Sequence, residues 1–531
     1  MKKNKSVIIY GKESKKNYSK ALKNLVNYYP ELENDKIIML SGNDEPVFDS
    51  KIKKVLSGYD LVNFEIEKYG DDRVVEAYQH DNLSTGDCIK YKPFSPCIRR
   101  IIRTCLSRSL NCYPSTVGSS LARQDLVNYL IKEGFPSNRT RYCDGINVHN
   151  VAFASSTTQA FVMILKTIAR KHDVILMSAP NYGIFAEVAE KLGVCVETIM
   201  LKEENNFFMD PNDLSKKIDE VNANLRIKYS NKLDYVPKCV AYLNINPHNP
   251  IGNVMTEDNL SLINKIGNIC LKKGVFIIDD LIYRDLTYNK NKLAFPIGSI
   301  PKFFNNTISL FGLSKSYGLA SFRAGFIVMP TPIFWGYATQ MFHSMDSISV
   351  LQVEAVRGAY NSTKKRYYEY NKYFNKVIHK YLYQLDLVYA LIYGINKVKD
   401  EKVRKKIKRD VFKYCKDKRI TEKILKGIKG VSIRKKTYPM SGFFIIVDFT
   451  KLKGKYYRGN LINCEYDLLK SMFNFGKVRY LMGENFVWPY EDEFVARINF
   501  AVNKNSLIHN FYQINRFVEE LRNVPYKKKN I

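Results

Sequence analysis

Short apolar runs alternate with amphipathic segments through the middle of the chain. The apolar runs of strand length are Val151–Ala154, Val174–Met177, Cys239–Leu243, Val275–Ile278 and Thr307–Phe311. Continuous apolar runs are typical of strands that helices cover on both faces. The region from about 115 to 330 therefore predicts a mainly parallel α/β sheet flanked by helices and built from right-handed βαβ units.

Two amphipathic segments in this region predict helices. One starts near 119 and would turn Leu121, Leu126, Val127 and Leu130 inward. The other is predicted over Gln159–Ala169, directly after a group of hydroxyl side chains. A helix that starts there would present its unpaired N–H groups at the edge of the sheet.

The pattern changes beyond about 340, where long charged helices precede two apolar strands at 440–449 and 494–502. These strands predict a smaller α+β domain. The expected division is an N-terminal arm with part of the small domain over 1–110, a large domain over 111–340, and a C-terminal small domain over 341–531 with a basic insertion at 397–436.

Composition and charge narrow the class of protein. The chain has 531 residues, 45% of them apolar, and a net charge of +31. The segment 397–436 carries 18 Lys and Arg against 5 Asp and Glu, or +13, while the remaining excess is diffuse. We interpret this charge as a solvated basic face, and nucleic acid is not expected as a partner.

The ten cysteines and the N-terminus favour a cytoplasmic protein. No CxxC pair or compact Cys/His group is present, so we expect free thiols and no metal site. The first residues lack a signal-peptide apolar run. The most apolar later stretch, 385–395, contains Asp386 and is shorter than a membrane span, so no membrane association is expected.

A lysine in a Gly-rich turn is the strongest candidate for chemistry. Lys315 stands between Ser314 and Ser316, and Arg323 follows eight residues later. Small neighbours let a bulky cofactor approach, and a fixed cation can hold an anionic group. One interpretation is a Schiff-base lysine carrying pyridoxal phosphate (PLP), with Arg323 on its phosphate. The other is an ordinary polar loop.

Polar groups follow several of the predicted strands, at the edge where ligands of open α/β sheets bind. Ser156, Thr157 and Thr158 precede a helix and could cradle a phosphate or simply cap the helix. Tyr182 lies in a Pro-Asn-Tyr-Gly turn, where it could stack on a planar ring or belong to the core.

Charged residues inside apolar runs need partners. Asp280 ends a buried strand, with Tyr283 three residues later, and would meet either a protonated heterocyclic nitrogen or a helix end. Arg497 lies mid-strand and requires a carboxylate from a side chain or a ligand. Asn249, held by Pro250, has an amide free to donate.

A further turn, early in the chain, follows the predicted strand that begins near 35. Gly42 lies at its bend, where backbone N–H groups could bind a carboxylate. Such a turn is more often plain punctuation between elements.

In order and spacing, these pieces resemble the fold-type I PLP-dependent enzymes, specifically the class I/II aminotransferase family. The resemblance spans roughly 40 to 515. The matching features are Tyr113 with Gly118, Ser156–Thr158, Pro180–Tyr182, Asn249 in NPHNPIG, Asp280 with Tyr283, Ser314–Lys315 with Arg323, Gly442–Phe444, and Arg497 in ARINFA.

The resemblance implies an enzyme that moves the amino group of an α-amino acid to a 2-oxo acid through a Lys315 Schiff base. It implies that Asp280 meets the pyridinium nitrogen and that Arg497 clamps the substrate carboxylate. Further implied cofactor contacts are Asn249 and Tyr283 on the phenolic oxygen, Tyr182 on the ring, and Ser156, Thr157, Thr158, Ser314 and Arg323 on the phosphate. Tyr113 would reach the phosphate of the neighbouring subunit, which implies a homodimer.

The sequence departs from the family pattern at three places. Gly312 stands where many members have a serine for the phosphate, and Ile251 stands where threonine is usual. The loop Ser156–Thr158 lacks the usual glycine. These departures leave the subfamily and the substrate open.

Two other functions remain as alternatives. A lyase or decarboxylase of the same fold, such as an aminocyclopropane-carboxylate synthase-like enzyme or an amino-acid β-decarboxylase, would use the same cofactor. A basic binding protein on a retired enzyme scaffold would act through 397–436. Against this last hypothesis, Lys315, Asp280 and Arg497 are all present.

Overall fold

The computed structural model describes residues 8–9, 38–39, 92–111, 113–230 and 234–524. Gly42 and most of the predicted N-terminal arm lie outside these ranges. Within them, Ile8–Ile9 (β1) and Ile38–Met39 (β2) form a short parallel pair. The remaining strands belong to a seven-stranded sheet, a four-stranded sheet and a small hairpin of Tyr456–Tyr457 (β12) and Asn460–Leu461 (β13).

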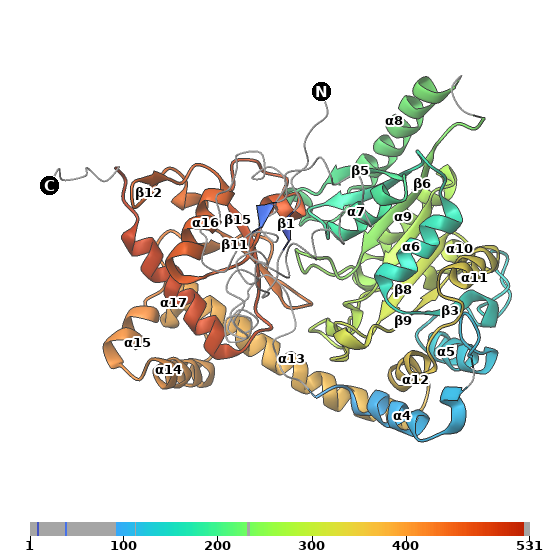
Figure 1. The fold of residues 1–531 in the computed structure, drawn as a ribbon, viewed down its shortest axis with the longest axis horizontal. Helices are drawn as coiled ribbons and strands as arrows, with labels where there is room; N and C mark the ends of the chain where they lie inside the picture. The colour runs from blue at the N-terminus through green and yellow to red at the C-terminus, as the bar shows by residue number, and fades with distance from the viewer. Residues whose placement is uncertain (1–7, 10–37, 40–91, 112, 231–233, 525–531) are drawn as a thin grey trace.

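The seven-stranded sheet forms the centre of the larger half of the molecule (Figure 1). Its strand order is β3-β9-β8-β7-β6-β4-β5, and β9 alone runs antiparallel to its neighbours. The strands are β3 (Val151–Ala154), β4 (Val174–Ala179), β5 (Cys195–Met200), β6 (Cys239–Ile245), β7 (Phe276–Asp280), β8 (Thr307–Gly312) and β9 (Gly325–Val328). The prediction of a mainly parallel sheet flanked by helices is confirmed.

Helices cover both faces because alternate strand residues on both faces are apolar. Ile175 and Met177 of β4 belong to one apolar cluster, whereas Val174 and Leu176 belong to another on the opposite face. The first cluster includes α6 (Thr157–Ile168), α7 (Ile184–Lys191) and α11 (Thr331–Met345). The second includes α8 (Pro211–Tyr229), α9 (Leu260–Lys273) and α10 (Pro301–Phe304).

The observed elements differ from the prediction at their ends. The strand β7 runs on through Asp279 and Asp280, because both carboxyl groups find partners inside the fold and need no turn to reach water. In α5 (Ser120–Lys132) the prediction for Leu121 was wrong, since its side chain is 71% exposed. The buried stripe of α5 passes through Ala122, Leu126 and Leu130, and Leu121 lies beside it.

The smaller half contains an antiparallel sheet in the order β10-β11-β15-β14. Its strands are β10 (Ser432–Ile433), β11 (Phe444–Asp448), β14 (Leu481–Met482) and β15 (Val495–Asn499). The helix α13 (Lys364–Tyr393) connects the two halves, and α16 (Glu465–Gly476) and α17 (Lys504–Glu520) pack in the smaller one (Figure 1).

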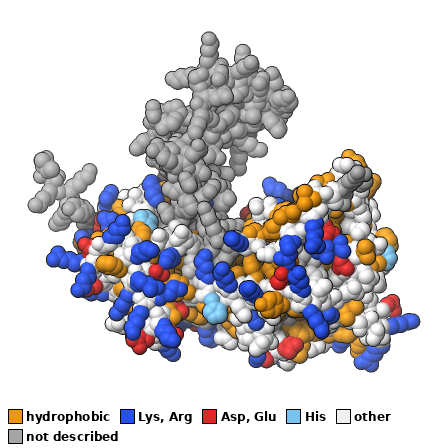
Figure 2. Space-filling model, turned by 90° about the horizontal axis from the view of Figure 1, so that it is seen from below, with side chains coloured by type: hydrophobic (Ala, Val, Ile, Leu, Met, Phe, Trp, Pro, Cys, Tyr) orange, Lys and Arg blue, Asp and Glu red, His pale blue; other side chains and the backbone are white. Residues whose placement is uncertain are grey.

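The basic segment 397–436 forms α14 (Glu401–Cys415), α15 (Lys418–Ile424) and the strand β10. Ile407 and Val411 of α14 are buried, while most of its lysines are exposed. Lys and Arg side chains cover both halves of the face seen in Figure 2 rather than one patch. No helix in the described ranges has the length and apolar content that crossing a membrane requires.

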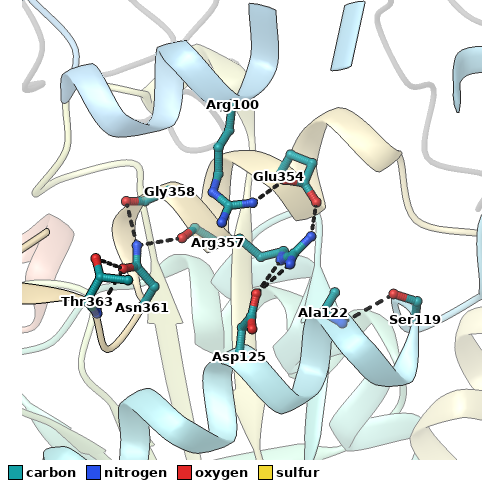
Figure 3. A network of polar contacts seen from close by, with 9 residues as sticks. All are labelled: Arg100, Ser119, Ala122, Asp125, Glu354, Arg357, Gly358, Asn361 and Thr363. Atoms are coloured by element: carbon teal, nitrogen blue, oxygen red, sulfur yellow. Dashed lines mark hydrogen bonds and ion pairs between the residues drawn. The ribbon is translucent and has the colours of Figure 1, made fainter. Parts of the chain in front are cut away.

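A polar network fastens α4 (Ser95–Cys105) and α12 (Val350–Ala359) to α5 (Figure 3). Arg357 of α12 donates to Asp125 of α5, with its Nε at 2.8 Å from Oδ2, and to Glu354. Glu354 also accepts from Arg100 of α4 at 2.6 Å. Arg357 therefore binds α5 directly through Asp125, and it binds Glu354, the carboxylate that holds α4.

Replacing Arg357 with alanine should lower the free energy of unfolding by about 1–3 kcal/mol, because two partly buried carboxylates lose a charged donor. Urea unfolding measures this. The matched control is Arg139→Ala, since the Arg139–Asp144 pair is exposed, at 85% and 83%, and should contribute little. Equal stability of the two variants would contradict the role given to the network.

Candidate active site

The lysine loop and the buried acid lie at the same edge of the large sheet. The strands β7 and β8 are parallel neighbours, with Asp280 opposite Leu310 in the register. The half-buried Lys315 follows β8 by three residues. Ser316 ties the two loops together, since its Oγ donates to the backbone oxygen of Ile282 at 3.3 Å. The segments that carry the candidate amine and the candidate carboxylate therefore leave neighbouring strands at one edge of the sheet.

Burial dominates the electrostatics of Asp280. Its side chain is 4% exposed, and burial raises its pKa to about 7 although the backbone N–H of Ile282 donates to Oδ1 at 3.1 Å. Asp279 has a pKa raised to about 7 by burial as well, but it accepts from Asn244 Nδ2 at 2.7 Å and from the backbone N–H of Ile297 at 2.9 Å. Asp280 is thus the acid whose charged form a further positive group would stabilise.

The hydroxyl residues Ser156, Thr157 and Thr158 begin α6 and lie next to the end of β8. Ser156 caps the helix by accepting from the backbone N–H of Gln159 at 3.0 Å, and Thr157 and Thr158 form the first turn. A Cβ placed on Gly312 would lie 3.3 Å from Thr157 Cγ2 and 2.4 Å from Ile282 Cδ1. The N-terminus of α6 therefore meets the start of the lysine loop, and the Ile282 side chain occupies the space that a larger residue at 312 would need.

Arg323 adds a fixed cation beside the lysine loop. Its Nη1 donates to Ser314 Oγ at 3.4 Å and to the backbone oxygen of Ala320 at 3.2 Å. Its backbone is in the left-handed region, with φ of 57°, two residues before β9 begins. The hydroxyl of Ser314, the guanidinium of Arg323 and the start of α6 together form a donor set suited to a phosphate.

Arg497 reaches this edge from the smaller sheet. It is 7% exposed, its Nη1 donates to Asn249 Oδ1 at 3.0 Å, and its guanidinium lies 4.1 Å from the centre of the Phe444 ring. Burial lowers the pKa of Arg497, while the nearby Tyr283 and Tyr182 oppose that shift. Partners of Arg497 thus come from both halves of the molecule.

Tyr182 is close enough to both Arg497 and Asp280 to interact with their charges. Burial raises the pKa of its hydroxyl; the charge of Arg497 acts against that rise, and the charge of Asp280 adds to it. Tyr283 is buried near the second sheet, since a Cβ on Gly442 would lie 3.7 Å from its ring and Ser441 Oγ donates to its backbone oxygen at 3.3 Å. Both tyrosines therefore interact electrostatically with Arg497, and Tyr182 also with Asp280.

Two residues of the sequence-predicted set do not join the others. Tyr113 is 90% exposed, so its side chain lies on the surface of this chain. Gly42 is outside the described residues. Sequence reasoning also missed Phe444 as the ring beneath Arg497. The signal was available in part, because a buried guanidinium needs an aromatic face or an anion beside it.

The side chains present fit PLP. A phosphate matches the donors of Ser314, Arg323 and the start of α6, whereas a cationic ring nitrogen matches Asp280. The half-buried lysine lies in the loop that follows β8, the strand beside the one that ends at Asp280. This set contains a partner for the phosphate, for the ring nitrogen and for the aldehyde of the cofactor.

Comparisons with known proteins identify the family of this chain. A family model described as "Aminotransferase class I and II" matches residues 82–385. A probable aspartate/prephenate aminotransferase of Aquifex aeolicus is 21% identical over 458 residues, covering 86% of this chain and 94% of that protein. The cystathionine beta-lyase PatB of Bacillus subtilis is 22% identical over 220 residues, covering 41% and 52%.

Solved structures share the fold. The aspartate aminotransferase of Thermus thermophilus with maleate has a TM-score of 0.63 at 14% identity, covering 89% of this chain and 100% of that one. The aspartate aminotransferase of Rhizobium meliloti has a TM-score of 0.65 at 15% identity, covering 90% and 100%. At these identities the likeness establishes the fold alone.

Gly312→Ser should destabilise the protein by about 1–3 kcal/mol, because the new Cβ meets Ile282 Cδ1. Adding Ile282→Val removes that atom and should recover most of the loss, although Ile282→Val alone costs about 1 kcal/mol. Urea unfolding of the three variants measures this. If Gly312→Ser alone is as stable as the wild type, Ile282 can move aside and the packing argument fails.

Asp280→Asn should make the cofactor-free protein more stable than the wild type above about pH 7, and the gain should shrink as the pH falls toward about 4. In the folded protein the Asp280 pKa is raised from 3.8 to about 7, so the stability provided by its proton is present below 3.8 and lost as the pH rises through 7. Urea midpoints across this range measure the effect.

Asp279→Asn is the control for that experiment. Its pKa is raised similarly, but its carboxyl oxygens accept from Asn244 and Ile297, and an amide NH2 would face one of these donors. We expect it to be less stable than the wild type at every pH. A gain for Asp279→Asn equal to that of Asp280→Asn would contradict the distinction drawn between the two acids.

Proposed function

Because the chain belongs to the class I and II aminotransferase family, whose enzymes depend on PLP, we propose that it transfers the amino group of an α-amino acid to a 2-oxo acid with Lys315 as the Schiff-base lysine. One observation carries the proposal. Asp280 ends β7, Lys315 follows the neighbouring parallel strand β8, and the segments after the two strands are joined by the Ser316–Ile282 hydrogen bond.

The cofactor phosphate would be held by the hydroxyls of Ser156, Thr157, Thr158 and Ser314, by the start of α6, and by Arg323. The Ser156 hydroxyl accepts a capping hydrogen bond and keeps its own hydrogen for donation. Asn249 and Tyr283 would bind the phenolic oxygen, and Tyr182 would lie against the ring. Each assignment uses a group that borders the same edge of the sheet.

When bound, PLP withdraws electrons from the α-carbon of an amino acid attached to its aldehyde carbon. Asp280 would act as the carboxylate that keeps a proton on the ring nitrogen, since a cation beside it offsets the cost of its buried charge. The amine of Lys315, once released, would move a proton from the α-carbon as a general base. Asp280 and Lys315 thus have separate roles, and the two residues are positioned by neighbouring strands.

Arg497 would bind the α-carboxylate of the substrate. The guanidinium is buried, rests on Phe444, and has one nitrogen committed to Asn249. A planar fork of this kind pairs with a carboxylate through two parallel hydrogen bonds. The Asn249 amide, which already accepts from Arg497, would couple the substrate clamp to the cofactor. Gly42 remains a proposed contact for the same carboxylate.

We also propose that the enzyme is a homodimer in which Tyr113 reaches the phosphate of the neighbouring subunit. Its side chain is 90% exposed, so a role in the site of its own chain is disfavoured. Leu106, Leu110 and Leu121, on neighbouring segments, are exposed at 83%, 47% and 71%.

Two wider features complete the proposal. The eight cysteines in the described ranges are free thiols, which supports the cytoplasm as the compartment. We retain the division into an N-terminal arm (1–110), a large domain (111–340) and a small domain (341–531) with a basic insertion. The substrates are an α-amino acid and a 2-oxo acid.

A β-lyase reaction is the second candidate, favoured by the match to the cystathionine beta-lyase of Bacillus subtilis. The same base, Lys315, and the same acid, Asp280, would serve both reactions. The products distinguish them. A lyase releases ammonia and a 2-oxo acid from one substrate alone, whereas transamination requires an amino acceptor.

The function is tested by reducing the PLP-loaded protein with borohydride and locating the modified residue by mass spectrometry. We expect the label on Lys315, and we expect Lys315→Ala to lose transaminase turnover by at least about 10²-fold, since it removes the base. A screen of amino donors against 2-oxoglutarate and pyruvate supplies the assay.

Lys292→Ala is the matched control, because Lys292 is an exposed lysine that pairs with Asp258 and has no proposed role in the site. It should keep both the label and the turnover. Full turnover by Lys315→Ala would end the proposal. Keto acid formed without an acceptor would instead favour the lyase.

A further inference from the structure

A third buried carboxylate, Asp285, lies near the lysine loop and accepts hydrogen bonds from three tyrosine hydroxyls. It is 3% exposed and lies in a short 3-10 turn over Arg284–Leu286, five residues after Asp280. Tyr370 donates to its Oδ1 at 2.8 Å. Tyr317 and Tyr360 donate to its Oδ2 at 3.0 and 3.3 Å. We call these four residues the Asp285 cluster.

The three tyrosines come from segments that surround the lysine. Tyr317 is two residues beyond Lys315. Tyr360 ends α12, and its hydroxyl is also 3.3 Å from the backbone oxygen of Gly312, where β8 ends. Tyr370 lies on α13, the helix that leads to the smaller half. One carboxylate therefore joins both ends of the lysine loop to the segment that carries Asp280 and to α13.

The charge of Asp285 is compensated within the same region. Arg366 is 3% exposed, its Nη2 donates to the Tyr317 hydroxyl at 3.3 Å, and its Nε donates to the backbone oxygen of Ala359 at 2.6 Å. Its guanidinium lies 4.4 Å from the centre of the Tyr370 ring. Burial raises the pKa of Tyr317, Tyr360 and Tyr370 far above the ordinary value, so all three remain protonated donors.

Such a network gives geometry rather than stability alone. An apolar core of the same volume often stabilises a fold as well as a buried charged network does. What three hydroxyls converging on one carboxylate add is a single arrangement of the segments that bear them. Here those segments carry the proposed base and the proposed acid.

We propose that Asp285 is a positioning residue, which holds Lys315 at its working distance from Asp280 by binding the hydroxyls of Tyr317 and Tyr360. This inference rests on the proposed function, which gives Lys315 and Asp280 their roles. Asp285 itself acts through the loop and contacts neither cofactor nor substrate.

The decisive variant is Asp285→Asn, which keeps the size of the side chain and exchanges one acceptor oxygen for an NH2 group. The tyrosines donate to both carboxyl oxygens, so in either orientation of the amide at least one hydroxyl loses its acceptor. Tyr360→Phe and Tyr370→Phe each remove one donor and serve if Asp285→Asn does not fold.

Two controls separate positioning from stability. Tyr367 lies on α13, as Tyr370 does, but outside the cluster, and its hydroxyl donates to Glu133 Oε1 at 3.2 Å. Tyr367→Phe therefore removes a comparable tyrosine–carboxylate hydrogen bond. Arg357→Ala weakens the fold through the α4–α12–α5 network and touches no residue of the lysine loop. All variants are prepared as full-length cofactor-free protein, and their unfolding midpoints are measured first.

The readout is the rate at which added PLP forms its Schiff base with Lys315, followed by absorbance, together with the pH midpoint of that absorbance. We expect Asp285→Asn to slow the reaction about 10- to 100-fold and to shift the midpoint, because the amine is displaced from the acid. Tyr360→Phe and Tyr370→Phe should fall between it and the wild type. Both controls should match the wild type.

A rate and a midpoint for Asp285→Asn equal to those of Arg357→Ala would overturn the positioning role and leave only a structural one. Failure of the wild type to react with PLP would instead overturn the proposed function. The two failures are distinguished by the wild-type measurement alone.

Discussion

Burial of one carboxylate at the end of β7 is the constraint on which the rest of the site depends. Asp280 is 4% exposed and accepts a hydrogen bond from the backbone N–H of Ile282 at 3.1 Å. Burial raises its pKa to about 7, so its carboxyl group is only partly ionised near neutral pH. The parallel register places Leu310 of β8 opposite it. The chain leaving β8 must therefore pass this acid within a few residues, and the lysine at 315 lies in that passage.

The site also requires both sheets, because its arginine belongs to the smaller one. Arg497 of β15 donates to Asn249, which follows β6 of the larger sheet. Backbone hydrogen bonds join the halves nearby: Met440 N–H donates to the Gly252 oxygen and Tyr288 N–H to the Met440 oxygen, each at 2.9 Å. Gly252 has a φ of 81°, and a Cβ there would lie 2.7 Å from Pro439. The two halves approach closely at a glycine beside the proposed cofactor contact.

Much of this arrangement could be predicted from local patterns. The buried strands of the larger sheet are continuous apolar runs, and parallel strands bring their carboxyl ends to one edge, so the residues that follow them were expected to meet. The antiparallel placement of β9 between β3 and β8 was not predictable, because pairing depends on contacts distant in sequence. The inward orientation of Leu121 was predicted wrongly, since a stripe shifted by one residue changes which side chain is buried.

Packing also explains why a motif cannot be transferred one residue at a time. Gly312 departs from the pattern that the family resemblance implies, and the space of its missing side chain is taken by Ile282 Cδ1. The same Ile282 donates its backbone N–H to Asp280, and its carbonyl accepts from Ser316. A change at 312 therefore acts on the acid and on the lysine loop through one shared neighbour. This group of contacts, rather than the single residue, is what should be compared between relatives. A serine introduced at 312 would bring a hydroxyl only by displacing Ile282, which holds Asp280 and Ser316 in place.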